Sequence, residues 1–455
     1  MKEEWVIMAA NRFLLRKEYF GGLIYDRLTR RETLLDKEEH CLLESIGDRD
    51  LGSMSLTTKQ RDFVEGLRAN GIVSANGFEA DRVEVPVIRD GVLSAPIRLY
   101  YHITFGCNLT CQHCMFGNRK RDPDELTTKE ALDVLRQLQE IGSPELRLTG
   151  GEPTVRPDLF EIIQDGVQRN MNVVVNTNGV FGDDIRRKFV TSGVGGLVIS
   201  VDGDRETHDR IRGRESFDVT MDTICYLAEY NGTAVRQITV CLNPTISREN
   251  WHLAEFLVRR AVELGGAKLG IEINFMPLRP FGKGRNLIPK MLDPKEWLSF
   301  TKEIARLRND PTVRETGLRI YSMNMDIFGC YPDCTDRPVP FDRSSCGAAT
   351  FRMGLGPDGG GNICGFIGAE AEFKTPTTRE ASVLDIWHSE AFEKFRHVVK
   401  EPCELCGFYR KECVGVCKAM SYIATGDFGK YDHYCFAHLL GKAGLQSRTV
   451  ERPGT

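Results

Sequence analysis

The strongest constraint in this chain is the stretch CNLTCQHC, which places Cys107, Cys111 and Cys114 on one short segment directly after the apolar run IRLYYHIT. Three thiolates on a tight loop can bind three of the four irons of a cubane iron–sulfur cluster, and one iron is then left open. The alternative is a zinc site completed by His113 or by a distant residue, because three thiolates and one imidazole are a recognised zinc set. The C-x3-C-x2-C spacing after a predicted strand favours the iron–sulfur cluster.

The rest of the composition agrees with an intracellular metalloprotein. The chain has 15 cysteines in 455 residues, and we expect it to be cytoplasmic because it shows neither a signal-peptide pattern nor a bilayer-spanning apolar run. Thiols stay reduced in that compartment, so metal binding explains the cysteines better than disulfides do. The formal net charge of -4 gives no reason to expect a nucleic acid or a membrane as a partner.

Short β-type runs alternate with longer amphipathic segments between residues 97 and 277. The predicted strands lie at residues 97–104, 145–150, 172–179, 195–203, 238–243 and 270–277. This alternation predicts an α/β fold with a parallel sheet, namely a partial (β/α)6 barrel of the TIM type. Chemistry in such barrels lies at the C-terminal ends of the strands, where CNLTCQHC, GGEP and NTNG occur.

Three domains follow from changes in pattern along the chain. Residues 1–90 predict a small α+β domain with a β-hairpin region at 13–36 and amphipathic helices at 37–47 and 58–73. Residues 91–310 form the predicted barrel. Residues 311–445 are rich in glycine, proline and cysteine and have little periodicity, which predicts loops organised around metal.

The cysteine triplet at the end of the first barrel strand resembles the defining motif of the radical S-adenosylmethionine (SAM) enzymes. The resemblance implies a four-iron cluster on Cys107, Cys111 and Cys114 whose open iron binds SAM. It also implies that an electron from the cluster cleaves SAM to methionine and a 5'-deoxyadenosyl radical. This chain departs from the usual pattern beside the last cysteine, where Met115 stands instead of an aromatic residue, which leaves the adenine contact unassigned.

The same resemblance implies a set of SAM contacts at the ends of the following strands. Gly150, Gly151 and Glu152 of TGGEP would bind the SAM amino group, and Asn178, Ser200 and Arg212 would lie near its ribose and carboxylate. Asn243 is a weaker candidate of the same kind. Each has a structural alternative, because Gly-Gly-Glu-Pro, Asn-Gly and Asp-Gly are ordinary turn sequences.

The late cysteines resemble the SPASM extension of radical SAM enzymes, which implies two auxiliary four-iron clusters. One set would be Cys346, Cys364 and Cys417, completed by either Cys330 or Cys334; the other would be Cys403, Cys406, Cys413 and Cys435. The spacing between Cys406 and Cys413 is one residue longer than usual. A zinc ribbon at 403–417 is the alternative that C-x2-C and C-x3-C alone would permit.

The first domain resembles, more loosely, the winged-helix-like leader-binding domain first known from the pyrroloquinoline quinone pathway. Together the three domains imply a maturase that modifies a ribosomally made precursor peptide. We expect the leader to add a strand to a sheet edge supplied by residues 13–26, FLLRKEYFGGLIYD. The alternative is a cap on the barrel that binds no ligand.

The predicted activity is oxidative cross-linking of the core peptide, through a carbon–carbon or thioether bond, with flavodoxin or ferredoxin as the external reductant. An epimerase is an alternative, in which Cys330 or Cys334 would return a hydrogen atom. Others are action on a small molecule or a folded protein, a non-catalytic iron–sulfur electron carrier, and a zinc-organised binding protein. No general acid or base is assigned, because Asp326, Asp333 and Asp342 are equally well explained as solvated loop carboxylates.

Overall fold

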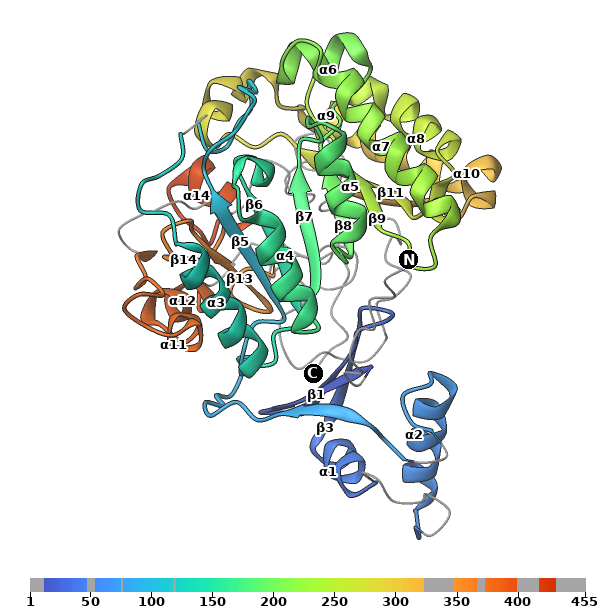
Figure 1. Ribbon diagram of the computed structural model, residues 1–455, viewed down its shortest axis with the longest axis vertical. Coiled ribbons are helices and arrows are strands. Elements are labelled where there is room, and N and C mark those ends of the chain that lie inside the picture. Colours follow the sequence, from blue (N-terminus) through green and yellow to red (C-terminus); the bar gives the residue numbers. More distant parts are fainter. Residues whose placement is uncertain are drawn as a thin grey trace, which may run out of the picture.

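The computed structural model describes residues 12–46, 54–74, 77–117, 120–322, 347–365, 373–398 and 417–430. Figure 1 shows a small blue domain at one end and a larger body built around a second sheet. The described residues contain no helix with the length and apolarity that crossing a lipid bilayer requires.

The small domain is a four-stranded sheet with two helices, as the α+β prediction requires. Its elements are β1 (Phe13–Glu18), β2 (Gly21–Asp26), β3 (Arg31–Asp36), α1 (Lys37–Ile46), α2 (Thr58–Ala69) and β4 (Ala80–Val83). Side chains from both helices and from the sheet share one apolar core, which contains Leu15, Ile24, Leu43, Val64 and Phe78. The domain therefore has a core of its own.

The sheet order in this domain corrects the predicted docking edge. The strands lie in the order β3-β2-β1-β4, with β1 antiparallel to β2 and parallel to β4. Strands β1 and β2, which make up the predicted edge FLLRKEYFGGLIYD, each pair on both sides. The outer strands of this sheet are β3 and β4 instead.

The larger sheet contains all six of the strands that the sequence predicts. They are β5 (Arg98–Thr104), β6 (Glu145–Gly150), β7 (Asn172–Thr177), β8 (Gly196–Ile199), β9 (Thr239–Leu242) and β11 (Ile271–Pro277). They pair in this order and all in parallel, which confirms the α/β barrel-type fold.

Helices follow most of these strands and cover one face of the sheet, as Figure 1 shows for α3, α4 and α5. Their bounds are α3 (Thr128–Glu140), α4 (Leu159–Gln168), α5 (Asp183–Thr191), α6 (Arg205–Arg212), α7 (Ser216–Thr233), α8 (Ala254–Glu263), α9 (Pro294–Asn309) and α10 (Pro311–Glu315). Helix α3 begins at a capping box in which Thr127 and Glu130 bond each other's backbone N–H groups.

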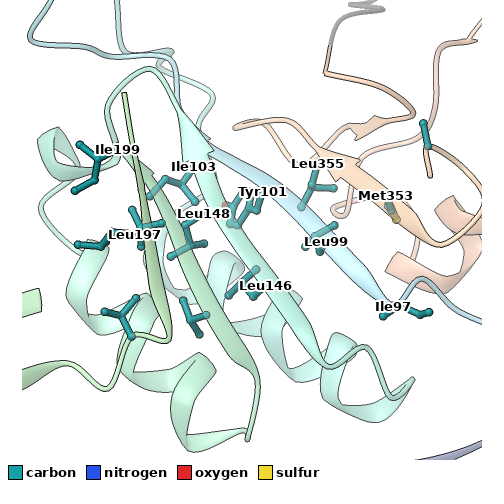
Figure 2. Packing of buried hydrophobic residues seen from close by; sticks show 14 of the residues in the cluster. Ile97, Leu99, Tyr101, Ile103, Leu146, Leu148, Leu197, Ile199, Met353 and Leu355 are labelled. Atoms are coloured by element: carbon teal, nitrogen blue, oxygen red, sulfur yellow. The ribbon is translucent and has the colours of Figure 1, made fainter. Parts of the chain in front are cut away.

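The core lies between this face and the helices. Leu99, Tyr101 and Ile103 of β5 belong to the same buried cluster as Leu135 of α3 and Ile162 of α4. Figure 2 shows these β5 side chains beside Leu146, Leu148, Leu197 and Ile199 of the neighbouring strands. Because side chains alternate along a strand, every second residue of each strand faces away from the helices.

The sheet continues beyond the six predicted strands at both edges. At one edge, both β12 (Arg319–Ser322) and β10 (Thr245–Ile246) pair in parallel with β11. At the other edge, β13 (Arg352–Leu355) pairs in parallel with β5 and antiparallel with β14 (Gly361–Asn362). The late region also contains α11 (Val383–Trp387), α12 (Glu390–Arg396) and α14 (Lys418–Thr425), so it is more regular than predicted. The proposed boundaries at 90, 310 and 445 stay predictions.

Buried polar contacts attach the small domain to the N-terminal ends of the barrel strands. Arg16 is fully buried, pairs with Glu18 at 2.7 Å, and donates to the carbonyl oxygens of Ala95 and Gly142 at 2.9 Å each. The Tyr25 hydroxyl donates to Glu145 of β6 at 2.9 Å. Such bonds fix orientation, because breaking one leaves a buried polar group unpaired.

We predict that Arg16→Met destabilises the attachment by about 3–5 kcal/mol, because it leaves the buried Glu18 charge without its cation. The matched control is Arg82→Met, which removes a half-exposed pair with Glu44 and should cost less than about 1 kcal/mol. Differential scanning calorimetry of the reconstituted enzyme measures both. Equal shifts in melting temperature for the two variants would contradict the structural role of Arg16.

Candidate active site

The three motif cysteines lie on the loop that follows β5, and all three are half-buried. The Leu109 backbone N–H donates to the Cys107 sulfur at 3.4 Å. Burial raises the pKa of the Cys107 thiol to about 11 and also raises that of Cys111. A thiolate in this loop therefore needs a nearby cation, which is what the iron of a cluster would supply.

The two glycines of TGGEP hold this loop against the end of β6. Gly151 donates its N–H to the carbonyl of Thr104, and Glu152 donates to that of Gly106, both at 2.8 Å. A Cβ atom on Gly150 would lie 2.1 Å from the Thr104 oxygen, and one on Gly151 would lie 2.1 Å from the Gly106 oxygen. Gly150 also has a φ of 139°. Both positions therefore require glycine for the close approach of two backbones.

Glu152 is fully buried at this contact. Its Oε1 accepts from the hydroxyls of Thr154 and Thr177 at 2.8 Å each, and its Oε2 accepts from the Asn178 N–H at 2.7 Å. Burial raises the pKa of Glu152 above its ordinary value. No lysine or arginine among the described residues forms an ion pair with it, so the carboxylate suits an ammonium group of a ligand. This arrangement fits the amino group of SAM.

Asn178 follows β7 and connects that strand end to the cysteine loop. Its side-chain amide donates to the Asn108 side chain at 2.7 Å, and its carbonyl accepts from Thr220 at 2.9 Å. Ser200 follows β8, is half-buried, and donates its N–H to the Thr177 carbonyl at 3.1 Å. Asn243, after β9, accepts from Asn274 at 2.9 Å. The predicted residues thus lie at one end of the sheet.

Arg212 ends α6 and lies beside the cysteine loop. Its Nε donates to Asp202 at 2.6 Å, and its Nη1 lies 3.9 Å from the Cys111 sulfur. Asp202 is fully buried, and burial raises its pKa. The Arg212 charge, together with His113, His208 and the hydrogen bond from the Thr245 N–H, outweighs burial and brings the pKa below the ordinary value. The ion pair therefore holds the guanidinium against a predicted cluster ligand.

Sequence reasoning missed Asp202 and Asn108 as parts of this site. Asp202 follows β8 in an Asp-Gly pair, which by itself predicts only a turn. A carboxylate at the C-terminal end of a barrel strand, however, indicates a functional residue. Asn108 lies between two cysteines of the motif and contacts Asn178. No local pattern distinguishes it from a solvated loop residue.

Two of the predicted auxiliary ligands lie in the described part of the chain. Cys364 follows β14 and is half-buried, and a Cβ added at its neighbour Gly365 would lie 3.4 Å from His102 of β5. Cys417 is buried just before α14, with Arg279 Nη1 at 3.6 Å from its sulfur. The remaining predicted ligands and acids lie outside the described residues: Cys330, Cys334, Cys346, Cys403, Cys406, Cys413, Cys435, Asp326, Asp333 and Asp342.

Comparison with known families gives two matches along this chain. Residues 101–257 match the radical SAM superfamily, and residues 346–413 match the SPASM iron–sulfur cluster-binding domain. The first match begins in β5 and contains the cysteine loop, Glu152 and Arg212. The second contains β13, β14 and Cys364.

Curated relatives cover most of the chain. The AdoMet-dependent heme synthase of Methanosarcina barkeri is 29% identical over 75% of this chain and 97% of its own length. The mycofactocin maturase MftC of Mycolicibacterium smegmatis is 28% identical over 72% of this chain and 80% of its own length.

A solved structure has the same fold. Streptococcus suis SuiB, crystallised with the precursor peptide SuiA, superposes with a TM-score of 0.68 at 19% identity and covers 92% of this chain and 97% of its own. Because only 8% of this chain is outside that coverage, the shared fold reaches into the small domain.

We predict that Gly151→Ala weakens SAM binding at least tenfold, because the added methyl group would separate Glu152 from the cysteine loop. Gly182→Ala is the matched control, since a Cβ there meets nothing within 4 Å and the φ of -83° suits alanine. Equilibrium dialysis of labelled SAM against both reconstituted variants gives the comparison. Unchanged affinity in Gly151→Ala would show that the close approach is dispensable.

Proposed function

We propose that this chain, a radical SAM enzyme with a SPASM domain, modifies a ribosomally made precursor peptide. The observation that carries the proposal is the small domain, which has an open outer strand and is fixed by buried bonds to the same sheet that positions the cysteine loop. The relationship to mycofactocin maturase over 72% of the chain supports it. The abundance of cysteine favours the reducing cytoplasm as the place of action.

The residues of the barrel would hold SAM at the cysteine loop. When bound, the four-iron cluster on Cys107, Cys111 and Cys114 and the SAM beside it supply a 5'-deoxyadenosyl radical that removes a hydrogen atom from the substrate. Glu152 would accept the amino group, and the Gly150–Gly151 backbone allows that approach. Asn178, Ser200 and Arg212 would hold the rest of SAM, with Arg212 oriented by Asp202.

We propose oxidative cross-linking as the modification, by a carbon–carbon or thioether bond within the core peptide. Such a product has lost two hydrogens, one as an atom and one as a proton whose electron needs an acceptor. The late cysteines, among them Cys364 and Cys417, would hold two auxiliary clusters, and these clusters would accept that electron. Flavodoxin or ferredoxin would provide the electron that starts each turnover.

The leader would bind along β3 of the small domain. The strand lies at the outer edge of its sheet, so an extended peptide can add to it through backbone hydrogen bonds. Its partly exposed side chains contrast with those of β2, all of which are buried. This assignment replaces the edge expected from the sequence.

A second candidate is action on a small molecule, because the heme synthase relative matches 75% of this chain and 97% of its own length. An epimerase is the alternative within peptide chemistry, and it would leave the mass of the peptide unchanged.

Mass spectrometry of a candidate precursor peptide tests the proposal. After incubation with reconstituted enzyme, SAM and reductant, we expect the peptide to lose two hydrogens per cross-link. One molecule of deoxyadenosine should form for each cross-link. Replacing Cys107, Cys111 and Cys114 with alanine should abolish SAM cleavage and remove about four of about twelve irons. Unchanged peptide mass with deuterium incorporated from heavy water would indicate epimerisation. A porphyrin modified while the peptide is untouched would establish the small-molecule function.

Hydrogen–deuterium exchange tests the leader site. A synthetic leader peptide should slow exchange at β3, residues 31–36, because its backbone would pair with that edge. The other outer strand, β4 at residues 80–83, is the internal control and should be unaffected. Protection of β4 instead, or of neither strand, would contradict the assignment.

A further inference from the structure

The face of the barrel sheet that points away from the helices carries an unusual set of polar side chains. We call it the inner face, and it includes Tyr100 and His102 of β5, Arg147 of β6 and Asn176 of β7. These residues alternate along their strands with apolar residues that belong to the core on the helix side, so they point the other way. The apolar residues are Leu99, Tyr101, Ile103, Leu146, Leu148, Val173 and Val175. Tyr100 pairs in register with Arg147. His102 lies one step closer to the cysteine loop.

Three inner-face residues have buried polar atoms with no hydrogen-bond partner among the described residues. They are Nδ1 of His102, Nε of Arg147 and Oδ1 of Asn176. The His102 side chain is more than nine-tenths buried, with 6% of its surface exposed. Because an unpaired buried polar group is destabilising, three of them on adjacent strands indicate that another molecule supplies the partners.

The charges on this face are unevenly paired. Arg98 is paired with Glu145, whose other oxygen accepts from Tyr25, and Arg319 is paired with Glu272. No carboxylate among the described residues lies within ion-pair distance of Arg147. Its guanidinium instead lies 5.3 Å from the centre of the Tyr100 ring. That contact is a cation–π interaction, which leaves the guanidinium hydrogens available for a ligand.

Tyr100 reports the resulting positive potential. Although burial raises its pKa, the charges of Arg147, Arg98 and Arg352 outweigh burial and lower the pKa to about 7. An environment that favours a phenolate also favours other anions of similar size.

We propose that Arg147, with His102 and Asn176 beside it, binds a carboxylate-bearing segment of the substrate on the inner face. The carboxylate would accept from Arg147 and from the His102 ring, and Asn176 would accept from a peptide N–H group. The inference rests on the proposed function and specifies its substrate class, a core peptide with an aspartate or glutamate near the modified residue. A porphyrin propionate is the other source of the same chemistry.

Saturation-transfer NMR with two tripeptides tests the site directly. The probes are acetyl-Ala-Glu-Ala-amide and acetyl-Ala-Gln-Ala-amide, which differ only in the carboxylate, and the protein is the reconstituted enzyme. We expect the glutamyl probe to bind at least about tenfold more tightly than the glutaminyl probe. Equal binding of the two probes to the unaltered enzyme overturns the proposal without need of any variant.

Substitution of Arg147 locates the binding. Arg147→Gln should abolish the preference for the glutamyl probe, and Arg147→Lys should retain part of it. Arg136→Gln is the matched control, because Arg136 is a half-exposed arginine on α3 that pairs with Asp133 and Glu140, and it should change nothing. Iron content verifies that each variant folds. A preference that survives in Arg147→Gln overturns the proposal.

Two further outcomes separate this inference from the proposed function. If a porphyrin with free propionates binds in an Arg147-dependent way, its methyl ester does not, and the precursor mass never changes, the carboxylate site is supported and the peptide assignment fails. If the precursor is modified equally well by the unaltered enzyme and by Arg147→Gln, and after its acidic residues are replaced with amides, the peptide assignment holds and the carboxylate site is overturned.

Discussion

The active site depends on the contact between the end of β6 and the backbone just before the first motif cysteine. Two N–H groups, of Gly151 and Glu152, bond the carbonyls of Thr104 and Gly106, and no side chain larger than hydrogen fits between the two backbones. The contact brings a fully buried carboxylate next to a loop of thiols. Desolvation disfavours the charged forms of the Cys107 thiol and the Glu152 carboxyl group. Both groups are therefore stable in their charged forms only when cations lie beside them. An iron cluster and an ammonium group meet that requirement together.

The barrel sheet separates structural from chemical tasks by the alternation of side chains along each strand. Residues that face the helices are apolar and make the core shown in Figure 2. Residues of the opposite face include arginines, a histidine and asparagines, and Val174, Val198 and Cys241 form a small apolar cluster there within the described part of the chain. A strand buried against helices on one side can carry polar groups on the other without weakening the core. The side chains of the inner face can therefore be suited to a substrate without loss of core packing.

Much of the fold and part of the site could be predicted from sequence because they depend on local signals. Six strands follow from apolar runs spaced by helical periods, and the cysteine triplet follows from its spacing. The errors concern contacts between distant segments. The order β3-β2-β1-β4 places a late strand beside β1, which no hairpin pattern encodes, and β13 joins the barrel sheet from more than two hundred residues away in the chain. Asp202 is recognised as part of the site only through its ion pair with Arg212, which is ten residues away in the chain. His102 is recognised only through its unpaired ring nitrogen on the inner face.

The two ends of the barrel sheet set a geometric requirement on any peptide substrate. The small domain is attached where the strands begin, through Ala95, Gly142 and Glu145, whereas Glu152 and the cysteine loop lie where β5 and β6 end. Strand β6 has 6 residues and therefore spans roughly 20 Å at about 3.3 Å per residue. A peptide held at the small domain and reacting beside Glu152 must cover at least that distance, which takes about six residues in an extended conformation. If the peptide followed the inner face, where Arg147 of β6 pairs in register with Tyr100 of β5, it would present its side chains to the proposed carboxylate site before any residue reached the cysteine loop.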